Sequence, residues 1–350
     1  MQSDRVSFFP LTHDVETILN FAGLLKGQIC SVKSYKEDDG KLRRTINNLH
    51  IDTLTTQGAG EIIIVPPDAS IDKLLRYHEP ILKAIKENKQ VRLLQKHAAK
   101  LGIKGSCVRR LEKLPEHHSF QNNYRKHFEV PVPVFGVLST EENCDKFLFQ
   151  LCMQEYFNAQ NVKTSFICSN QLGSLTGMYT IPEELFDNTY TFTQKVSYLN
   201  QYLCEVYFET KPDLMIVGVP GGVFSLQDNE NDYFAEFAHL FSHAVKFDAI
   251  SYNLFRNEVR LDETLDAIET YFAYAFKTAV YIFGISGMIA KRLNDSNEYE
   301  ILKIQSYLTE KQLCSKRESG GWIVDTNDTQ GLYHVLSKLL DEMQNGVHLL

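Results

Sequence analysis

The chain has 350 residues, of which 43% are hydrophobic and 23% charged, and its formal net charge at pH 7 is -8. This composition is normal for a globular protein with a buried core, and the length favours two domains. The net charge is acidic, and the sequence has no basic stripe of the kind that nucleic-acid-binding proteins carry, so we expect no nucleic-acid partner.

The first third of the chain alternates short apolar runs with amphipathic segments. It predicts strands at Val6–Phe9, Gln28–Val32, Glu61–Val65 and Gln90–Leu94, and helices at His13–Leu25 and Ile71–Glu87. Strands that alternate with helices indicate βαβ units and a parallel sheet. We therefore expect an α/β domain over residues 1–113, followed by a polar, aperiodic linker over residues 114–130.

The alternation starts again in residues 131–350, the second predicted domain. Strands are expected at Val134–Leu138, Thr164–Cys168, Leu214–Val219, Ala249–Leu254, Leu302–Leu308 and Trp322–Val324, and helices at Cys144–Ala159, Gln194–Thr210, Asp232–Val245 and Thr329–Met343. Both domains are therefore predicted to be α/β, each with a mainly parallel sheet.

The stretch Tyr271–Ala290 is nearly uncharged and about as long as a membrane span needs to be. Lys277 lies inside it, and Gly284, Ser286 and Gly287 interrupt its second half. A lysine at the centre of a span is unfavourable by about 2.5 kcal/mol or more. The pattern therefore favours a helix that ends near Lys277 and a buried strand after it, and we expect no membrane partner.

Seven cysteines are scattered along the sequence, with neither a Cys-x-x-Cys pair nor a Cys/His cluster that has the spacing of a zinc site. No signal peptide precedes them. They indicate reduced thiols in a cytoplasmic protein, and we expect no metal centre.

The segment from Gly136 to Phe147 joins a buried strand to an amphipathic helix, which is the setting of a phosphate-binding loop. A functional loop ends in Gly-Lys-Ser/Thr: the glycine lets backbone amides wrap the phosphates, the lysine reaches the outer phosphates, and the hydroxyl holds magnesium. Here Lys146 is present, but Asp145 replaces the glycine and Phe147 replaces the hydroxyl. The acidic residues of the loop, Glu141, Glu142 and Asp145, would repel a polyphosphate. The simpler roles for Lys146 are a surface charge at the helix start or a partner for Glu141 or Glu142. The segment is either a degenerate phosphate loop or an ordinary strand–loop–helix turn.

A second candidate is the apolar strand that runs from Asp213 into Pro220, Gly221 and Gly222. In this setting the far end of the strand normally carries an acid that positions magnesium, but here Asp213 lies at the opposite end. Glycines permit close approach of a ligand or unusual backbone angles. A tight turn accounts for them equally well.

Cys144 stands near the start of a predicted helix, where thiol pKa values fall, and Lys146 is close. Neighbouring acids act in the opposite direction, and no histidine lies nearby in sequence to serve as a base. We expect Cys144 to be a packing residue, and no residue is assigned a catalytic role.

The order of these segments resembles the peptide maturation system proteins, accessory proteins encoded beside radical-SAM maturases of ribosomally made, modified peptides in clostridia and their relatives. The resemblance is carried by Phe8-Phe9-Pro10-Leu11, Phe135-Gly136, Asn143-Cys144-Asp145-Lys146-Phe147, Gln150-Leu151 and Gly218-Val219-Pro220-Gly221-Gly222. The family tends to have Cys-Asn-Lys-Phe in the loop and Gly-Ile-Pro-Gly-Gly after the later strand. Asp145 departs from the usual asparagine and weakens the case for anion binding, and Ser169–Gly177 also departs from the family pattern.

The resemblance implies a Rossmann-like first domain and a degenerate P-loop NTPase-like second domain of the dethiobiotin synthetase and MinD branch. It implies a non-hydrolysing accessory or scaffold protein in peptide maturation, whose partners are a precursor peptide, a radical-SAM maturase or both. The expected ligand-binding residues are Gly136, Asn143, Cys144, Asp145, Lys146, Pro220, Gly221 and Gly222. The cofactor is unknown, since a nucleotide is compatible with the loop but not required, and the oligomeric state stays open, a homodimer included.

Two alternatives belong to other functional classes. The first is a nucleotide-dependent enzyme of the kinase or ligase type, which would use Lys146 and an unrecognised metal ligand supplied by Asp213, Asp228, Asp232 or Asp248. The second is a module that binds a small anion at Gly221–Gly222.

Overall fold

The structure is a computed structural model, and it describes residues 5–8, 12–25, 28–34, 51–53, 61–65, 74–75, 78–116, 127–224, 235–258, 262–292, 299–304 and 314–344. The chain divides into two compact units. Unit 1 comprises residues 1–113 and 170–180, and unit 2 comprises residues 114–169 and 181–350. Residues 170–180 therefore lie apart in sequence from the rest of their unit.

Hydrogen bonds hold residues 170–180 to the rest of unit 1. The backbone N–H of Thr180 donates to the carbonyl of Lys113 at 3.0 Å, and Nζ of Lys113 donates to the carbonyl of Gly177 at 2.7 Å. Nδ2 of Asn170 donates to Oδ2 of Asp14. From the sequence we predicted that this segment belongs to the second domain. Contacts between residues that are far apart in the sequence leave no periodic pattern, so its place in unit 1 could not be predicted.

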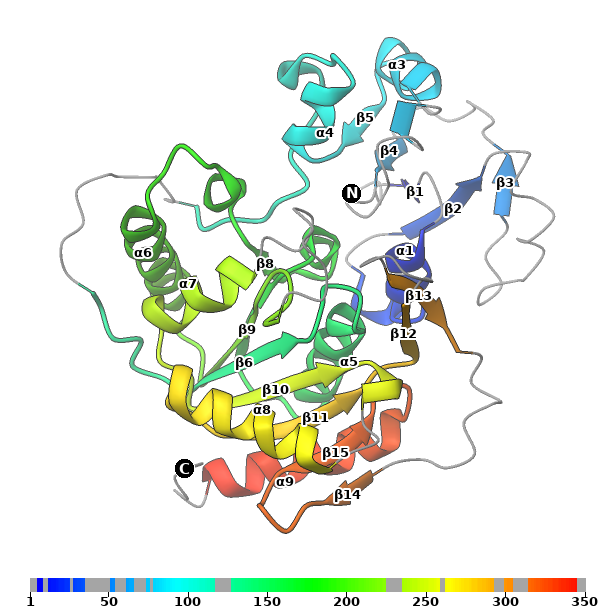
Figure 1. The fold of residues 1–350 in the computed structure, drawn as a ribbon. Helices are drawn as coiled ribbons and strands as arrows, with labels where there is room; N and C mark the ends of the chain where they lie inside the picture. The colour runs from blue at the N-terminus through cyan, green and yellow to red at the C-terminus, as the bar shows by residue number, and fades with distance from the viewer. Residues whose placement is uncertain are drawn as a thin grey trace. The chain divides into compact units, whose positions relative to one another are not determined.

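Unit 1 contains a parallel sheet, as the alternation of strands and helices predicted (Figure 1). Its strands are β1 (Arg5–Phe8), β2 (Gln28–Ser34), β3 (Ile51–Thr53), β4 (Glu61–Ile64) and β5 (Gln90–Arg92), in the order β3-β2-β1-β4-β5. Its described helices are α1 (His13–Leu19), α3 (His78–Lys86) and α4 (Gln95–Lys100). The later segment contains the short strand β8 (Tyr179–Thr180), which is not one of the five strands of this sheet. Helix α1 begins after Thr12, whose Oγ1 accepts the N–H of Val15 as an N-cap.

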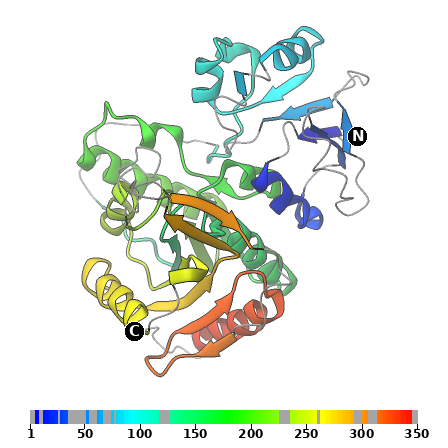
Figure 2. The ribbon, with the colours of Figure 1, turned by 45° about the vertical axis from the view of Figure 1, so that its right-hand side comes forward.

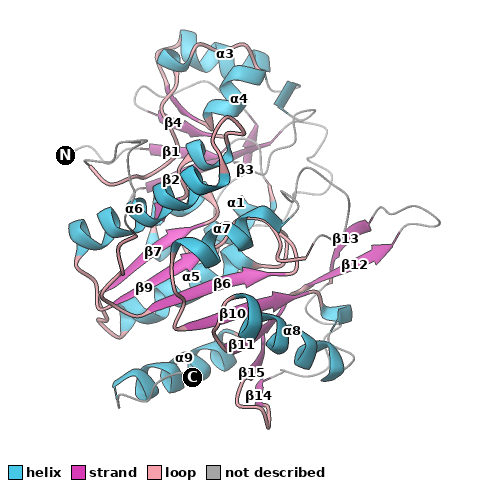
Figure 3. Cartoon of the chain, turned by 60° about the vertical axis from the view of Figure 1, so that its left-hand side comes forward, coloured by secondary structure: helices cyan, strands magenta, loops and turns pink. Residues whose placement is uncertain are grey.

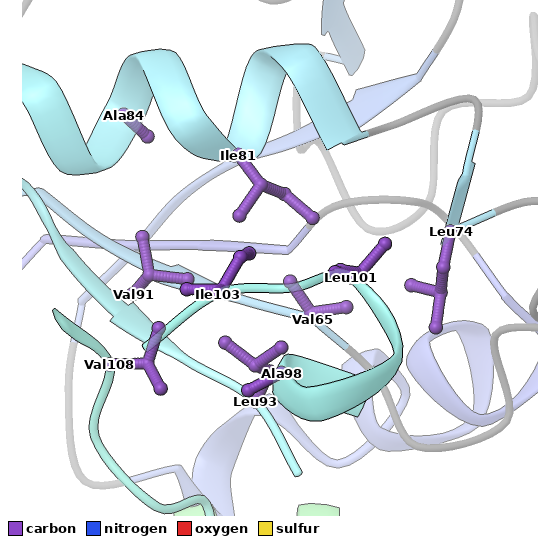
Figure 4. Close-up of a cluster of buried hydrophobic side chains, with 10 residues drawn as sticks. All are labelled: Val65, Leu74, Ile81, Ala84, Val91, Leu93, Ala98, Leu101, Ile103 and Val108. Carbon is purple, nitrogen blue, oxygen red and sulfur yellow. The ribbon is translucent and has the colours of Figure 1, made fainter. Parts of the chain in front are cut away.

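A hydrophobic cluster lies between α3, α4 and the β4–β5 edge of this sheet (Figure 4). Its members are Val65, Leu74, Ile81, Ala84, Val91, Leu93, Ala98, Leu101, Ile103 and Val108, all buried. Ile81 and Ala84 stand three residues apart and therefore project from the same face of α3.

Unit 2 is built on a larger, mainly parallel sheet (Figure 1). Its strands run in the order β14 (Cys314–Lys316), β15 (Trp322–Asp325), β11 (Val280–Ile285), β10 (Ala249–Leu254), β6 (Val134–Ser139), β9 (Leu214–Gly218) and β7 (Thr164–Cys168). The described pairs are parallel except β14–β15, which is antiparallel. Every residue of β6, β9, β10 and β11 is buried, as expected for parallel strands covered on both faces.

Helices cover both faces of this sheet. On one face α5 (Lys146–Ala159) packs beside α9 (Thr329–Gln344). On the other lie α6 (Phe192–Thr210), α7 (Glu236–Ala244) and α8 (Asp262–Ala275) (Figure 1). The connection after β6 therefore turns to the opposite face from the connections after its neighbours β9 and β10.

The nearly uncharged stretch Tyr271–Ala290, which has the length of a membrane span, is divided among three elements. Helix α8 ends at Ala275, the buried strand β11 begins at Val280, and β12 (Met288–Arg292) follows. Lys277 lies between the first two with φ of 53°, so the predicted helix end and buried strand are both present. Among the helices of the described residues, none has the length and apolar character that crossing a membrane requires.

Strand β12 pairs antiparallel with β13 (Tyr299–Lys303), and the two lie side by side in Figure 2. This ribbon extends past the carboxyl ends of the parallel strands (Figure 3). The sequence predicted a strand over Leu302–Leu308, but β13 begins three residues earlier, at Tyr299, and ends at Lys303. Residues 305–308 lie outside the described residues. The same holds for residues 9–11, 71–73, 76–77 and 117–126, and for Asp228 and Asp232.

Candidate functional site

The carboxyl end of β6 is the place in unit 2 where a ligand site is expected. The chain leaves β6 toward one face of the sheet and leaves β9 and β10 toward the other. Such a reversal opens a crevice at the carboxyl ends of the strands, and ligands of open α/β sheets bind there. The loop that the sequence singled out, residues 140–145, follows β6 at this point.

Lys146 is the first residue of α5, and its side chain is only 1% exposed. Its Nζ donates to Oε2 of Glu142 at 2.9 Å, to the carbonyl of Val219 at 2.8 Å, and to the carbonyl of Gly221. An ammonium group has three N–H donors, so these three acceptors account for all of them. The lysine is held by the protein itself.

Glu142 completes this arrangement. Its Oε2 also accepts the backbone N–H of Gly221, so one carboxylate oxygen receives both an ammonium and an amide donor. Gly221 has φ of 70°, the left-handed region that glycine adopts at little cost. The structure thus brings together two predicted site residues, Lys146 and Gly221, and adds Glu142 between them.

The turn after β9 is fixed against β6 by its backbone. The N–H groups of Val219 and Val223 donate to the carbonyls of Val137 and Ser139, each at 3.0 Å. Pro220, Gly221 and Gly222 lie between these anchors and are buried. Because the turn is anchored on both sides, its carbonyls keep their positions around Nζ of Lys146.

Asp145 has a structural role in the loop. Its backbone is left-handed, with φ of 53° and ψ of 23°, the conformation in which glycine is favoured and which Asp and Asn tolerate best among other residues. Its Oδ2 accepts from Ser286 Oγ at 2.8 Å, from the N–H of Gly287 at 2.7 Å and from Thr326 Oγ1 at 3.0 Å. The carboxylate therefore ties the loop to the segments that follow β11 and β15.

The other two loop residues predicted to bind a ligand, Cys144 and Asn143, contact neighbouring protein residues. Cys144 is buried against Phe255 and Met288. Asn143 is exposed, and its backbone N–H and Nδ2 donate to the carboxylate of Glu141 at 3.1 and 3.3 Å. Burial raises the pKa of the Glu141 carboxyl, and the hydrogen bonds from Asn143 oppose that shift.

Gly136 lies inside β6 rather than in the loop. A Cβ added there would lie 3.0 Å from side-chain atoms of Leu138 and Phe247. Its small size therefore serves core packing.

The end of β9, where the sequence analysis looked for a magnesium-positioning acid, packs against a glutamine. A Cβ on Gly218, at the end of β9, would lie 2.8 Å from Cδ of Gln150 and closer still to its Oε1. Gln150 is fully buried, and its Nε2 donates to the carbonyl of Ile167 at 3.0 Å. Gln150 belongs to the Gln150-Leu151 pair noted in the sequence analysis, but nothing in the sequence indicated that it packs against Gly218.

Of the acids proposed as metal ligands, the two that the structure describes do not lie at this edge of the sheet. Asp213 precedes β9 and Asp248 precedes β10, so both stand at the amino ends of their strands. Oδ2 of Asp248 accepts the N–H of Val134 at 2.8 Å, where β6 begins. Within the part of the chain that the structure describes, no group of three or more His, Cys, Asp or Glu residues is placed to hold a metal ion.

Polar residues that directly follow buried strands were the missed signal. Ser286 follows β11 and Thr326 follows β15, and both donate to Asp145. Asn253, near the end of β10, donates from Nδ2 to the carbonyl of Cys144 at 3.0 Å. Because parallel strands end at one edge, such residues gather there and could have been grouped from the sequence.

Comparisons with known proteins give a fold but no family. No family model and no curated protein matches the sequence. A DUF1611 family protein from Anabaena variabilis is similar in structure, with a TM-score of 0.51 and 11% identity over 81% of this chain and 88% of that chain. This likeness shows a shared fold.

Two further solved structures align less closely. A LAO/AO transport system kinase has a TM-score of 0.32 and 11% identity over 80% of this chain and 78% of that chain. A nucleotide-binding protein from Archaeoglobus fulgidus in complex with ADP has a TM-score of 0.34 and 12% identity over 58% of this chain and 86% of that chain. Scores this low carry no argument about ligand or activity.

Proposed function

We propose that this chain is a non-hydrolysing accessory protein, built on a P-loop-like α/β unit whose phosphate position is closed by the protein's own residues. One observation carries the proposal: the three donors of the Lys146 ammonium go to Glu142, Val219 and Gly221. Phosphoryl transfer depends on a lysine and a metal that neutralise the phosphates. A lysine committed to internal acceptors does not provide that charge.

The other parts of the catalytic apparatus are also used for structure. Phe147 is buried, with 6% of its surface exposed, and phenylalanine offers no ligand to magnesium. Asp145 is bonded to the segments after β11 and β15. Gly218 has no room for an acid beside Gln150. These contacts support a loop that has the position of a phosphate loop but lacks the groups for phosphoryl transfer.

The finer fold assignment belongs to the same proposal. The strand order β3-β2-β1-β4-β5 in unit 1 is that of the first five strands of a doubly wound dinucleotide-binding sheet, which supports a Rossmann-like unit. In unit 2, a central strand that leads through a loop into α5 supports the P-loop-like assignment. The dethiobiotin synthetase and MinD branch is supported by the sequence resemblance alone.

For the pathway we propose the maturation of a ribosomally synthesised, modified peptide, with the chain as scaffold for a precursor peptide, a radical-SAM maturase or both. Support comes from the sequence resemblance alone, carried by Asn143–Phe147 and Gly218–Gly222. The test is affinity purification of the tagged chain from its native host, with mass spectrometry of bound peptides and proteins. Enrichment of neither a small ribosomal peptide nor a radical-SAM enzyme would remove this part of the proposal.

The test of the closed loop is release of inorganic phosphate from Mg-ATP and Mg-GTP by the full chain and by Lys146→Ala. We expect both proteins to stay at background. Turnover by the wild type that Lys146→Ala abolishes would contradict the proposal and favour the kinase or ligase alternative.

A further inference from the structure

Two donors meet at one oxygen of Glu142. Nζ of Lys146 lies 2.9 Å from Oε2, and the backbone N–H of Gly221 donates to the same atom. Lys146 is buried at the start of α5, and Gly221 is buried in the turn after β9. Together they form a hole for a single oxyanion oxygen, here named the Lys146–Gly221 anion hole, and the carboxylate of Glu142 fills it.

Glu142 is the replaceable member of this cluster. Its side chain is 40% exposed, against 1% for Lys146, so a rotation of Glu142 carries its carboxylate into water. The other two acceptors of Nζ are the backbone carbonyls of Val219 and Gly221, which no side-chain rotation removes. A ligand can therefore take over only the lysine N–H that Glu142 receives, together with the N–H of Gly221.

The vacated hole suits a carboxylate better than a phosphate. It offers two donors to one oxygen, and the carbonyls of Val219 and Gly221 border it with negative partial charge. Glu141 stands next in sequence to Glu142, so a dianionic phosphate would meet stronger repulsion than a monoanionic carboxylate. The group that occupies the hole is itself a carboxylate.

We infer that the Lys146–Gly221 anion hole is a carboxylate-binding site, which Glu142 blocks until an acidic group of an incoming peptide replaces it. The inference rests on the proposed function, since a loop that turned over polyphosphate would need Lys146 for the phosphates. A tethered carboxylate competes at a high effective concentration. A single small carboxylate therefore binds the wild type poorly, and a peptide that makes further contacts is favoured.

The experiment removes the internal competitor. Glu142→Ala is titrated with sodium formate, and its Tm is measured against sodium chloride at equal ionic strength. We expect formate to raise the Tm of Glu142→Ala and to leave the wild type unchanged, with an apparent Kd at least about tenfold lower for the variant. Glu141→Ala is the matched control, because its carboxylate accepts from Asn143 and not from Lys146.

Peptides then distinguish the source of the carboxylate. One acetylated alanine peptide carries a central glutamate and an amidated C-terminus, a second carries a free C-terminal carboxylate, and an amidated all-alanine peptide is the blank. Stabilisation of Glu142→Ala by either acidic peptide beyond the blank supports the site and identifies the source. Stabilisation by neither overturns the assignment to a peptide.

Other outcomes also count against the inference. An equal response to formate in the wild type, Glu142→Ala and Glu141→Ala overturns it, and so does stronger stabilisation by inorganic phosphate than by formate. If Glu142→Ala does not fold, Glu142→Gln provides a weaker, neutral competitor that should still respond to formate more than the wild type does. Absence of a formate effect while nucleotide turnover stays at background defeats this inference and leaves the proposed function standing.

Discussion

The carboxylate of Glu142 and the ammonium of Lys146 lie 2.9 Å apart across the start of α5. The same ammonium donates to the carbonyl of Val219 at 2.8 Å, so the ion pair also joins the loop after β6 to the turn after β9. A phosphate would have to enter between these two segments. Under the proposed function, Lys146 has the position of a phosphate-loop lysine and its charge is used within the fold.

Lys146→Met should destabilise the protein more than a matched lysine substitution. Lys195 is similarly buried and pairs with a similarly exposed glutamate, Glu236, at 3.1 Å. Lys146→Met also removes the donor to the carbonyls of Val219 and Gly221. We expect it to lower the free energy of unfolding by about 1–3 kcal/mol more than Lys195→Met, since buried acceptors lose their partner. Urea unfolding measures both, and equal losses would show that the two carbonyl contacts contribute nothing.

Asp145 combines a left-handed backbone with three hydrogen bonds to its carboxylate, and two substitutions separate these contributions. Asp145→Gly keeps the backbone conformation and loses the bonds, so we expect it to be destabilised by about 2 kcal/mol or more. Asp145→Ala loses both and should be worse by about 1 kcal/mol. The check is the urea midpoint of each variant. A glycine variant more stable than the wild type would contradict a structural role for the carboxylate.

Gly218 should tolerate a side chain only when Gln150 is shortened. In Gly218→Ala the new methyl group would displace the amide of Gln150 from its bond to Ile167, at a cost of about 1–3 kcal/mol. Gln150→Ala should remove most of that cost in the double variant. A double-mutant cycle on unfolding free energies tests this, and additive single effects would mean that the two residues do not compete for space.

Unit 1 should lose stability in mild acid through His97. Burial of its imidazole, with smaller contributions from Lys96 and Lys100, lowers the pKa of His97 from 6.5 to about 4. The unfolded chain therefore takes up this proton at a higher pH than the folded chain, so the contribution is present above about pH 6.5 and is lost as pH falls toward 4. Unfolding free energies measured across that range should fall less steeply for His97→Leu than for the wild type. The same slope in both proteins would mean that the fold does not lower the pKa of His97.

β7 (Thr164–Cys168) and β10 (Ala249–Leu254) have the bounds that the sequence predicted, since mainly apolar runs between helices are typical of buried parallel strands. Ser251 and Asn253 interrupt the apolar run of β10 and are nevertheless buried. β14 was missed, since it has three residues, two of them exposed, and leaves no pattern. The start of α5 was placed too early, because Asp145 takes a left-handed conformation just before the helix.

The lysine of the candidate site could be predicted from the sequence, but the backbone carbonyls that accept its hydrogen bonds could not. Lys146 lies within a strand–loop–helix pattern that can be recognised in the sequence. The carbonyls of Val219 and Gly221 come from a turn 73 and 75 residues later, and backbone acceptors have no residue-type signature. The sequence offered Glu141 or Glu142 as partners for Lys146, and the structure confirms the pairing with Glu142.

The most direct test of the closed loop is detection of the Lys146 ammonium by NMR in the full chain with ¹⁵N-labelled lysine. A buried ammonium held by three acceptors exchanges its protons slowly, so we expect a protected Nζ signal that is lost in Lys146→Met and retained in Lys195→Met. We expect this signal to keep its position when Mg-ATP is added. A signal that shifts in proportion to Mg-ATP binding, or no protected signal at all, would contradict a lysine held by Glu142, Val219 and Gly221.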